Sequence, residues 1–85
     1  MNHAVIWQPP AETALIACLL RSADKPGDWA LVHEIEARLR VEPLQAGESR
    51  EDDFRLLYVR PFAVLYWTDQ DARTVYVEEL QWVGR

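Results

Sequence analysis

The chain has 85 residues, a formal net charge of −5 and 49% hydrophobic residues. This is enough apolar material for one buried core, so we expect residues 1–85 to form a single domain. Proteins that bind phosphate backbones usually carry a net positive charge, whereas this chain is negative. Nucleic acid is therefore an unfavourable partner, and a basic protein segment is a better one.

The single cysteine, Cys18, excludes an internal disulfide, and no cluster of cysteine and histidine has metal-ligand spacing. The first ten residues, MNHAVIWQPP, lack the basic start and long apolar run of a signal peptide. The longest apolar run, Ala14 to Leu20, is too short to span a membrane. We therefore expect a cytoplasmic protein with no membrane segment, metal or cofactor.

The first half of the sequence predicts a strand followed by two helices. Residues 3–8 are rich in β-branched and aromatic side chains and stop at two prolines. Residues 11–22 are strong helix formers and almost wholly apolar after Thr13, so we expect a helix covered on most sides. Asp24 is the expected N-cap of a second helix. Its apolar stripe has three- and four-residue spacing and consists of Trp29, Val32, Ile35 and Leu39.

The second half changes to the period of strands. Residues 54–59 alternate, and residues 62–68 are continuously apolar, which favours a central strand covered on both faces. After a polar turn at 69–72, a last strand is predicted over 74–83. Within it the apolar residues change parity between Val77 and Leu80, and a bulge near Glu78-Glu79 would reconcile the two halves. The predicted fold class is α+β in the order β-α-α-β-β-β, a helical hairpin packed on a small antiparallel sheet.

This order resembles the RelE/ParE superfamily, the toxins of bacterial type II toxin–antitoxin systems, which include plasmid-stabilisation toxins. The residues that carry the resemblance lie in segment 43–80 and are Pro43, Gly47, Phe54-Arg55 and Val64-Leu65-Tyr66. The resemblance implies a toxin-like protein that binds a cognate antitoxin and, for the ParE branch, DNA gyrase as its target. A homodimer remains an open alternative for its assembly.

Two departures from the family pattern weigh against RNA cutting. Ala63 stands where a second arginine usually precedes the central strand motif, and Trp82 stands where the nucleases keep a histidine, tyrosine or arginine. We therefore expect action by protein binding rather than by an enzymatic activity. Two alternatives remain: a ribosome-dependent mRNA endoribonuclease with a non-standard catalytic site at Glu48, Arg50 and Arg55, and a degenerate, non-toxic interaction module.

The polar residues before and at the start of the second strand form the first candidate partner site. They are Glu48, Ser49, Arg50 and Arg55. The arginines would hold a carboxylate or phosphate through paired hydrogen bonds, and the competing interpretation is a solvated loop with a surface ion pair. Arg55 alternates with Phe54, Leu56 and Tyr58, so we expect its side chain on the less apolar face of the sheet.

Trp82 is the second candidate, because it ends the last strand where the sheet is expected to have an open edge. Its ring is either a partner anchor or part of the core. His3 and His33 lie outside the segment of resemblance, and we expect structural or surface roles for both. The run Glu51-Asp52-Asp53 is interpreted as a solvated loop, because consecutive residues of an extended chain cannot all point at one ion.

Overall fold

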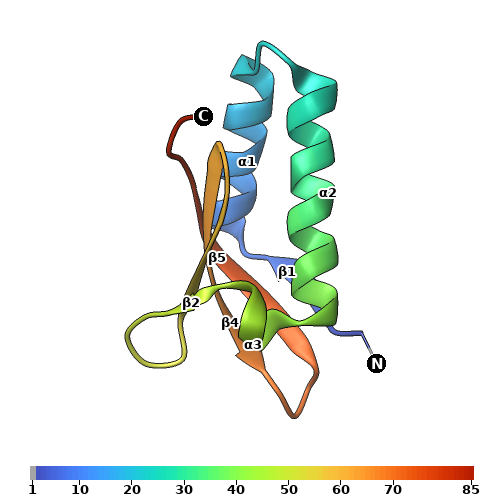
Figure 1. The fold of residues 1–85 in the computed structure, drawn as a ribbon, viewed down its shortest axis with the longest axis vertical. Helices are drawn as coiled ribbons and strands as arrows, with labels where there is room; N and C mark the ends of the chain where they lie inside the picture. The colour runs from blue at the N-terminus through green and yellow to red at the C-terminus, as the bar shows by residue number, and fades with distance from the viewer. Residues whose placement is uncertain (1) are drawn as a thin grey trace.

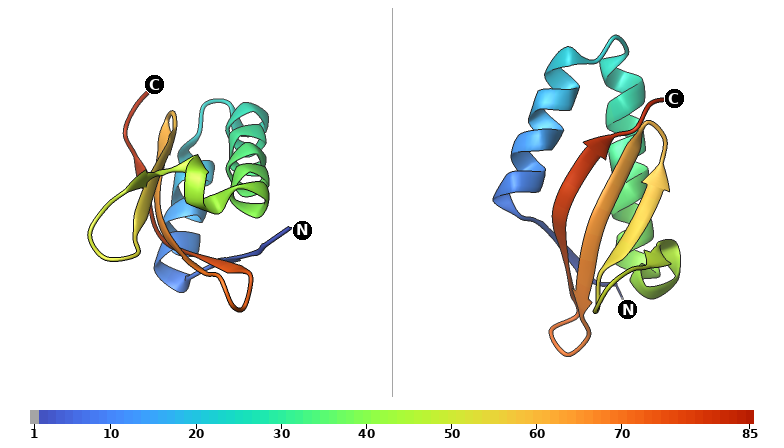
Figure 2. Two further views of the ribbon diagram at one scale, coloured as in Figure 1. Left: turned by 60° about the horizontal axis from the view of Figure 1, so that its bottom comes forward. Right: turned by 90° about the vertical axis from the view of Figure 1, so that its left-hand side faces the viewer.

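The computed structural model describes residues 2–85. Its elements are β1 (Ala4–Trp7), α1 (Pro9–Arg21), α2 (Lys25–Val41), α3 (Pro43–Ala46), β2 (Glu48–Ser49), β3 (Arg55–Val59), β4 (Phe62–Asp69) and β5 (Thr74–Trp82). The α1–α2 hairpin covers one face of the sheet and leaves the other face open (Figures 1 and 2). This confirms the α+β fold class, with α3 and β2 as two short additions that the sequence pattern did not predict. No helix within residues 2–85 has the length and apolar character needed to cross a membrane.

The five strands lie in the order β1-β5-β4-β3-β2. The last three long strands form an antiparallel meander, and β4 is central, as predicted. The side chains of Phe62, Val64 and Tyr66 are fully buried between β4 and the helices. The sheet is not wholly antiparallel, because β1 pairs with β5 in the parallel direction, Ala4 beside Thr74 and Trp7 beside Val77.

The predicted bulge in the last strand is confirmed. Leu65 of β4 pairs with Glu79, whereas the next residue, Tyr66, pairs with Val77, so Glu78 is the extra residue of β5. The inserted residue restores the alternation after Val77, which keeps Leu80 on the buried face. A regular strand would have turned Leu80 toward solvent.

The second helix begins as predicted, whereas the first begins at Pro9, before the predicted range of 11–22. The Asp24 side chain caps α2 by accepting a hydrogen bond from the Gly27 amide at 3.0 Å. The expectation that the first helix is covered on most sides is wrong, because only Ala11 and Leu15 of α1 are buried and Ile16 and Leu20 are exposed. Since α1 has the sheet on one side and α2 on another, its remaining side faces solvent.

The predicted stripe of α2 is correct for three of its four residues. Val32, Ile35 and Leu39 are buried, but Trp29 is 47% exposed and Asp28 is 1% exposed. Position 28 continues the same four- and three-residue spacing, whereas Trp29 lies about 100° further round the helix. Asp28 is therefore the fourth buried residue of the stripe, where Trp29 was predicted.

Candidate partner-binding site

Arg55 lies on the face of the sheet that the helices cover. It pairs with the buried Tyr66 of β4 and shares the face of Leu57 and Val59, which enter the core. The expectation that Arg55 reaches the less apolar face is therefore wrong, because Leu57 and Val59 supply the core residues of β3 and Tyr58 is exposed. The Arg55 guanidinium donates a hydrogen bond to the Gly47 carbonyl at 3.1 Å, at the end of this face of the sheet.

The four-residue polar cluster does not form one site. Ser49 pairs with Arg55, whereas Glu48 pairs with Leu56, so neighbouring residues of β2 point to opposite faces. Arg50 forms an exposed ion pair with Glu48 at 3.0 Å, beside the open face. The structure therefore separates Arg50 and Glu48 from Arg55, and a catalytic site built from all three has no common face on which to act.

Arg55 borders a cleft of about 590 Å³ at the end of the sheet. The charged residues that line it are Arg55 and the four aspartates Asp52, Asp53, Asp69 and Asp71. Their summed charge makes the cleft attractive to cationic groups and unfavourable for phosphate. The acidic run before β3, interpreted as a solvated loop, thus contributes two of its residues to this cleft. Residues 2–85 contain no group of histidines, cysteines or acids placed to hold a metal ion.

A buried tyrosine, Tyr66, holds α3 against the sheet near Arg55. The Tyr66 hydroxyl donates to the Pro43 carbonyl of α3 at 2.5 Å. Burial raises the pKa of Tyr66 above its ordinary value, so the hydroxyl keeps its proton and its role as a donor. Gly47 lies against the same hydroxyl, and a Cβ at this residue would come within 2.8 Å of both the Tyr66 hydroxyl oxygen and the Leu56 carbonyl oxygen. The close approach explains why glycine stands here.

Trp82 lies at the opposite end of the sheet. Arg55 is opposite Tyr66 and Trp82 is opposite Phe62, so the two candidates are separated by about 13 Å along β4. β1 pairs with β5 over Thr74–Val77, and within residues 2–85 the remainder of β5 has only β4 beside it in the sheet. The Trp82 ring meets Phe62 edge to face with 5.8 Å between centroids, yet 47% of the residue is exposed. Trp82 thus combines a core contact with a free surface.

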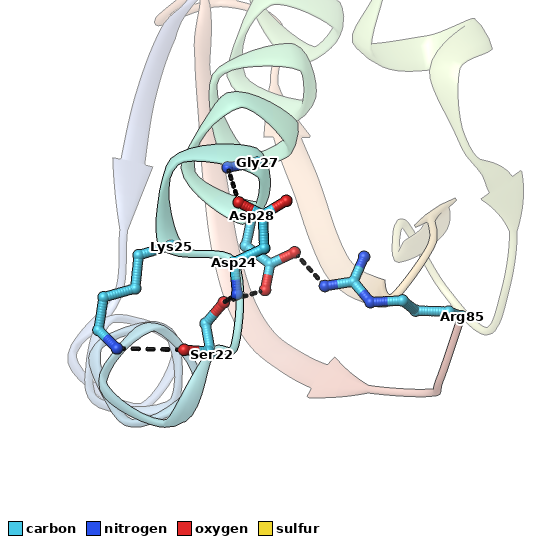
Figure 3. Close-up of polar contacts among 6 residues, drawn as sticks. All are labelled: Ser22, Asp24, Lys25, Gly27, Asp28 and Arg85. Atoms are coloured by element: carbon cyan, nitrogen blue, oxygen red, sulfur yellow. Dashed lines mark hydrogen bonds and ion pairs between the residues drawn. The ribbon is translucent and has the colours of Figure 1, made fainter.

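A buried carboxylate, that of Asp28, contacts Ser22 and Arg85 (Figure 3). Asp28 accepts a hydrogen bond from the Ser22 hydroxyl at 2.5 Å and an ion-paired hydrogen bond from the Arg85 guanidinium at 2.5 Å. These two donors, Ser22 first, hold the pKa of Asp28 below its ordinary value against the opposing effect of burial. The Arg85 guanidinium also lies over the Trp82 ring, 5.4 Å from its centroid. Sequence reasoning missed this cluster, although the helical spacing from Asp28 to Val32 was a usable signal.

The histidines and the cysteine occupy the following places. His33 is exposed on α2 beside Trp29, with 4.9 Å between ring centroids. His3 lies nearer to the acidic cleft than its sequence position indicates, because its Nε2 is 3.3 Å from the side-chain oxygen of Gln70, which lines that cleft. Cys18 is half-buried and borders a cavity of about 420 Å³ together with Trp82 and Arg85.

Comparison with known proteins finds likeness at the level of structure. No family model and no curated protein matches the chain. A chain of the RelBE2 toxin–antitoxin complex from Mycobacterium tuberculosis superposes with a TM-score of 0.77 at 22% identity, over 96% of this chain and 99% of that one. The chromosomal ParDE system from P. aeruginosa gives 0.73 at 16% identity, over 95% and 96%. The isolated E. coli RelE toxin gives 0.69 at 14% identity, over 98% and 86%.

The likeness extends from the first strand to the last in each case. RelE crystallised as an isolated toxin is among the matching structures, so the likeness is to the toxin half of these systems. Together with the helical hairpin, the mixed sheet and the open sheet face, it shows that this chain has the fold of the RelE/ParE toxins.

Proposed function

We propose that the chain is the toxin-like component of a bacterial type II toxin–antitoxin system and that it acts by binding proteins. The observation that carries the proposal is the acidic cleft at Arg55, where four aspartates surround one arginine on a toxin fold. Such a surface suits cationic side chains of a protein partner. The partner complexes named for the RelBE2 and ParDE structures support a cognate antitoxin as the first partner.

The charge distribution favours protein binding over mRNA cleavage. A bound RNA would bring its phosphates against the four aspartates of the cleft, in a chain with a net charge of −5. The single arginine there already donates to the Gly47 carbonyl. Arg50 lies on the other face, paired with Glu48, so it adds no second cation to the cleft.

Trp82 is the proposed anchor of the antitoxin. Its ring packs edge to face on the buried Phe62 and has the Arg85 guanidinium over it, yet 47% of the residue is exposed, as expected of an aromatic residue that anchors an interface. The neighbouring residue Val83 is also exposed and extends the apolar surface. Arg55, about 13 Å away along the sheet, marks the proposed second contact, in which basic groups of the antitoxin meet the four aspartates that line the cleft with it.

The proposal is tested by comparing two tryptophans of equal exposure. Trp82→Ala should weaken binding of the cognate antitoxin by roughly 2 kcal/mol or more. Trp29→Ala is the matched control, since Trp29 is equally exposed at 47% but lies on the helical hairpin. Titration calorimetry gives the affinities, and a urea melt of each variant gives the folded fraction. Equal affinities for both variants would place the interface elsewhere.

Toxicity assays separate the possible targets. Controlled expression of the chain with and without a cognate antitoxin should show growth inhibition that the antitoxin relieves. In extracts, inhibition of gyrase supercoiling would identify the ParE-type target, whereas fragments of ribosome-bound mRNA would identify the endoribonuclease. We expect His33→Ala and His3→Ala to leave growth inhibition intact, because neither imidazole lines the Arg55 cleft. Expression without any growth effect would favour the non-toxic interaction module.

A further inference from the structure

The helical hairpin carries an apolar groove of about 410 Å³ beside the turn that joins α1 to α2, at the end of the molecule away from α3 (Figure 1). Three side chains of α1 and three of α2 line it: Ile16, Leu19 and Leu20, and Lys25, Pro26 and Trp29. At 71%, Leu20 is the most exposed large apolar residue within residues 2–85, and Ile16 and Trp29 are each about half exposed. Apolar side chains gathered at one exposed place mark a surface that binds another protein.

This surface has a basic end and an acidic end. Lys25 lines the groove at the hairpin turn, and its ammonium donates to the Ser22 carbonyl at 3.1 Å and has further N–H groups to donate. Glu12 is exposed in the first turn of α1, four residues before Ile16. Since Glu12, Ile16 and Leu20 follow one another at four-residue spacing, they share one side of α1. The surface therefore changes from acidic through apolar to basic along that helix.

We propose that the groove is the interface of a homodimer, in which the α1 helices of two copies lie antiparallel across a two-fold axis near Ile16. Glu12 and Leu20 lie about 6 Å from Ile16 on either side along the helix. The antiparallel copy therefore brings its acidic end to the basic end of the first copy. Leu20 of each copy enters the groove of the other, and Lys25 reaches Glu12 of the other copy. A two-fold interface requires one patch that is complementary to itself in this way.

The distribution of charge favours a second copy at this surface. Residues 9–41, which span the hairpin, contain four lysines and arginines and five acids, one of which is the buried Asp28. The rest of the chain contains five lysines and arginines and nine acids. Two copies therefore repel each other most where the sheet and the acidic cleft lie, and they meet with little net repulsion at the hairpin. A strongly basic partner gains little attraction there, whereas a second copy matches both charged ends.

The small size of the groove determines the strength of the dimer. Its lining comes from one and a half turns at the end of α1 and from the first turns of α2, so the interface belongs to the smallest class, below about 1,200 Å² in total. We therefore expect a reversible dimer that forms as the protein concentration rises. Trp82 does not line this groove, so the dimer and the proposed antitoxin contact are separate surfaces.

Sedimentation equilibrium of the chain alone, over a hundredfold range of concentration, tests the proposal. The average mass should rise from that of one chain toward that of two. Leu20→Gln should raise the dissociation constant roughly tenfold or more, because apolar burial is lost in both copies. Val41→Gln is the matched control, since Val41 is also an exposed apolar residue of the hairpin but lies outside the groove, and it should leave the dissociation constant unchanged.

Charge reversal tests the antiparallel arrangement. Glu12→Lys and Lys25→Glu should each weaken the dimer, and the chain with both substitutions should recover it, because opposite charges again face each other across the axis. Glu12→Lys makes the chain less negative, so general repulsion alone would strengthen association and predicts the opposite sign. The indole N–H resonance of Trp29 should move with concentration, whereas that of Trp82 should not.

Three results would overturn the proposal: a monomer at every concentration, a dimer that Leu20→Gln leaves intact, or no recovery in the doubly reversed chain. If the chain stays monomeric and the cognate antitoxin shifts the Trp29 resonance, the groove belongs to the antitoxin and the homodimer is excluded. These measurements use the chain alone, so their failure leaves the antitoxin contact at Trp82 standing. Loss of antitoxin binding, with the dimer intact, would instead count against the proposed function.

Discussion

The carboxylate of Asp28 is buried, and two hydrogen bonds replace the hydration that it loses. Removing a carboxylate from water costs several kcal/mol unless hydrogen bonds and a counter-ion replace the lost hydration. Ser22 donates its hydroxyl to one oxygen and Arg85 donates to the other. The same Ser22 hydroxyl accepts the Asp24 amide at 3.1 Å, so a single side chain links the α1–α2 turn to the buried acid. The turn, the first turn of α2 and the end of the chain are therefore held by one carboxylate.

This arrangement predicts a defined pH dependence of stability. The folded-state pKa of Asp28 is lowered, so the unfolded chain takes up the proton more readily than the folded chain. The stabilisation is fully present above the ordinary pKa of 3.8 and is lost as the pH falls through the lower pKa of the folded state. Ser22→Ala removes the largest cause of the shift and should cost about 1–3 kcal/mol at neutral pH.

Urea melts of the original chain and of Ser22→Ala over a pH series measure this effect. The difference in unfolding free energy between the two should shrink as the pH is lowered from about 4 to about 2. A matched control is Ser49→Ala, which removes an exposed hydroxyl at the rim of the Arg55 cleft. A difference for Ser22→Ala that stays constant across the series would show that the hydroxyl does not act through the charge of Asp28.

At the scale of elements, α3 is the piece that the sequence pattern left out and that shapes the Arg55 cleft. It is held to β4 by the hydrogen bond from Tyr66 to Pro43, and Gly47 lets the chain pass close to that hydroxyl and to β3. In the sequence, Pro43 and Gly47 were recognised only as residues that carry the family resemblance. Their packing role depends on a strand that lies about twenty residues further along the chain, and local sequence carries no sign of such a contact.

A double-mutant cycle tests this packing. Tyr66→Phe leaves the Pro43 carbonyl without its donor and should cost about 1–3 kcal/mol. Gly47→Ala should also cost about 1–3 kcal/mol, because its methyl group overlaps the Tyr66 hydroxyl and the Leu56 carbonyl. Since Tyr66→Phe removes one of the two overlapping atoms, Gly47→Ala should cost less in that background. Denaturant melts of the four proteins give the coupling, and simple additivity would mean that the Leu56 carbonyl alone opposes the methyl group.

The sequence predicted the positions of the helices and strands better than it predicted which of their faces are buried. Strand positions, the central place of β4, the bulge at Glu78 and the Asp24 cap followed from local patterns and are confirmed. The covered face of β3 was wrongly predicted, because Arg55, Leu57 and Val59 alternate with residues that are almost as apolar, and only the helices decide which set is buried. The same reason explains Asp28, whose partner Arg85 is 57 residues away. The separation of Arg50 from Arg55 likewise required the pairing of β2.

For the whole molecule, the charge distribution decides which partners approach quickly. The chain combines a net charge of −5 with a cleft lined by four aspartates, and both favour encounter with a basic surface. The exposed apolar residues Ile16, Leu20 and Trp29 lie on the outer side of the hairpin, around an apolar groove of about 410 Å³. The acidic and the apolar surfaces are therefore carried by different elements.

The charge makes a prediction for association kinetics. The association rate of the antitoxin should fall as sodium chloride is raised from about 50 to about 500 mM, while the dissociation rate changes little, because long-range attraction between exposed charges is screened. Replacing Asp69 and Asp71 together by asparagine should reduce this salt dependence, whereas replacing Glu34 and Glu12 on the helices by glutamine should reduce it less. Stopped-flow fluorescence measures the rates. A salt-independent rate would show that the acidic cleft does not guide the encounter.

The parallel pairing of β1 with β5 has a consequence for how the protein is made. The first strand finds its neighbour only when Thr74–Val77 are available, near the end of the sequence. Closing so long a loop is entropically costly and places the step late. During translation β1 is made long before the strand beside which it lies, so the sheet cannot be completed until Thr74–Val77 have been synthesised. A nascent chain stopped before Thr74 lacks the strand that pairs with Val5 and Trp7, and its sheet is incomplete.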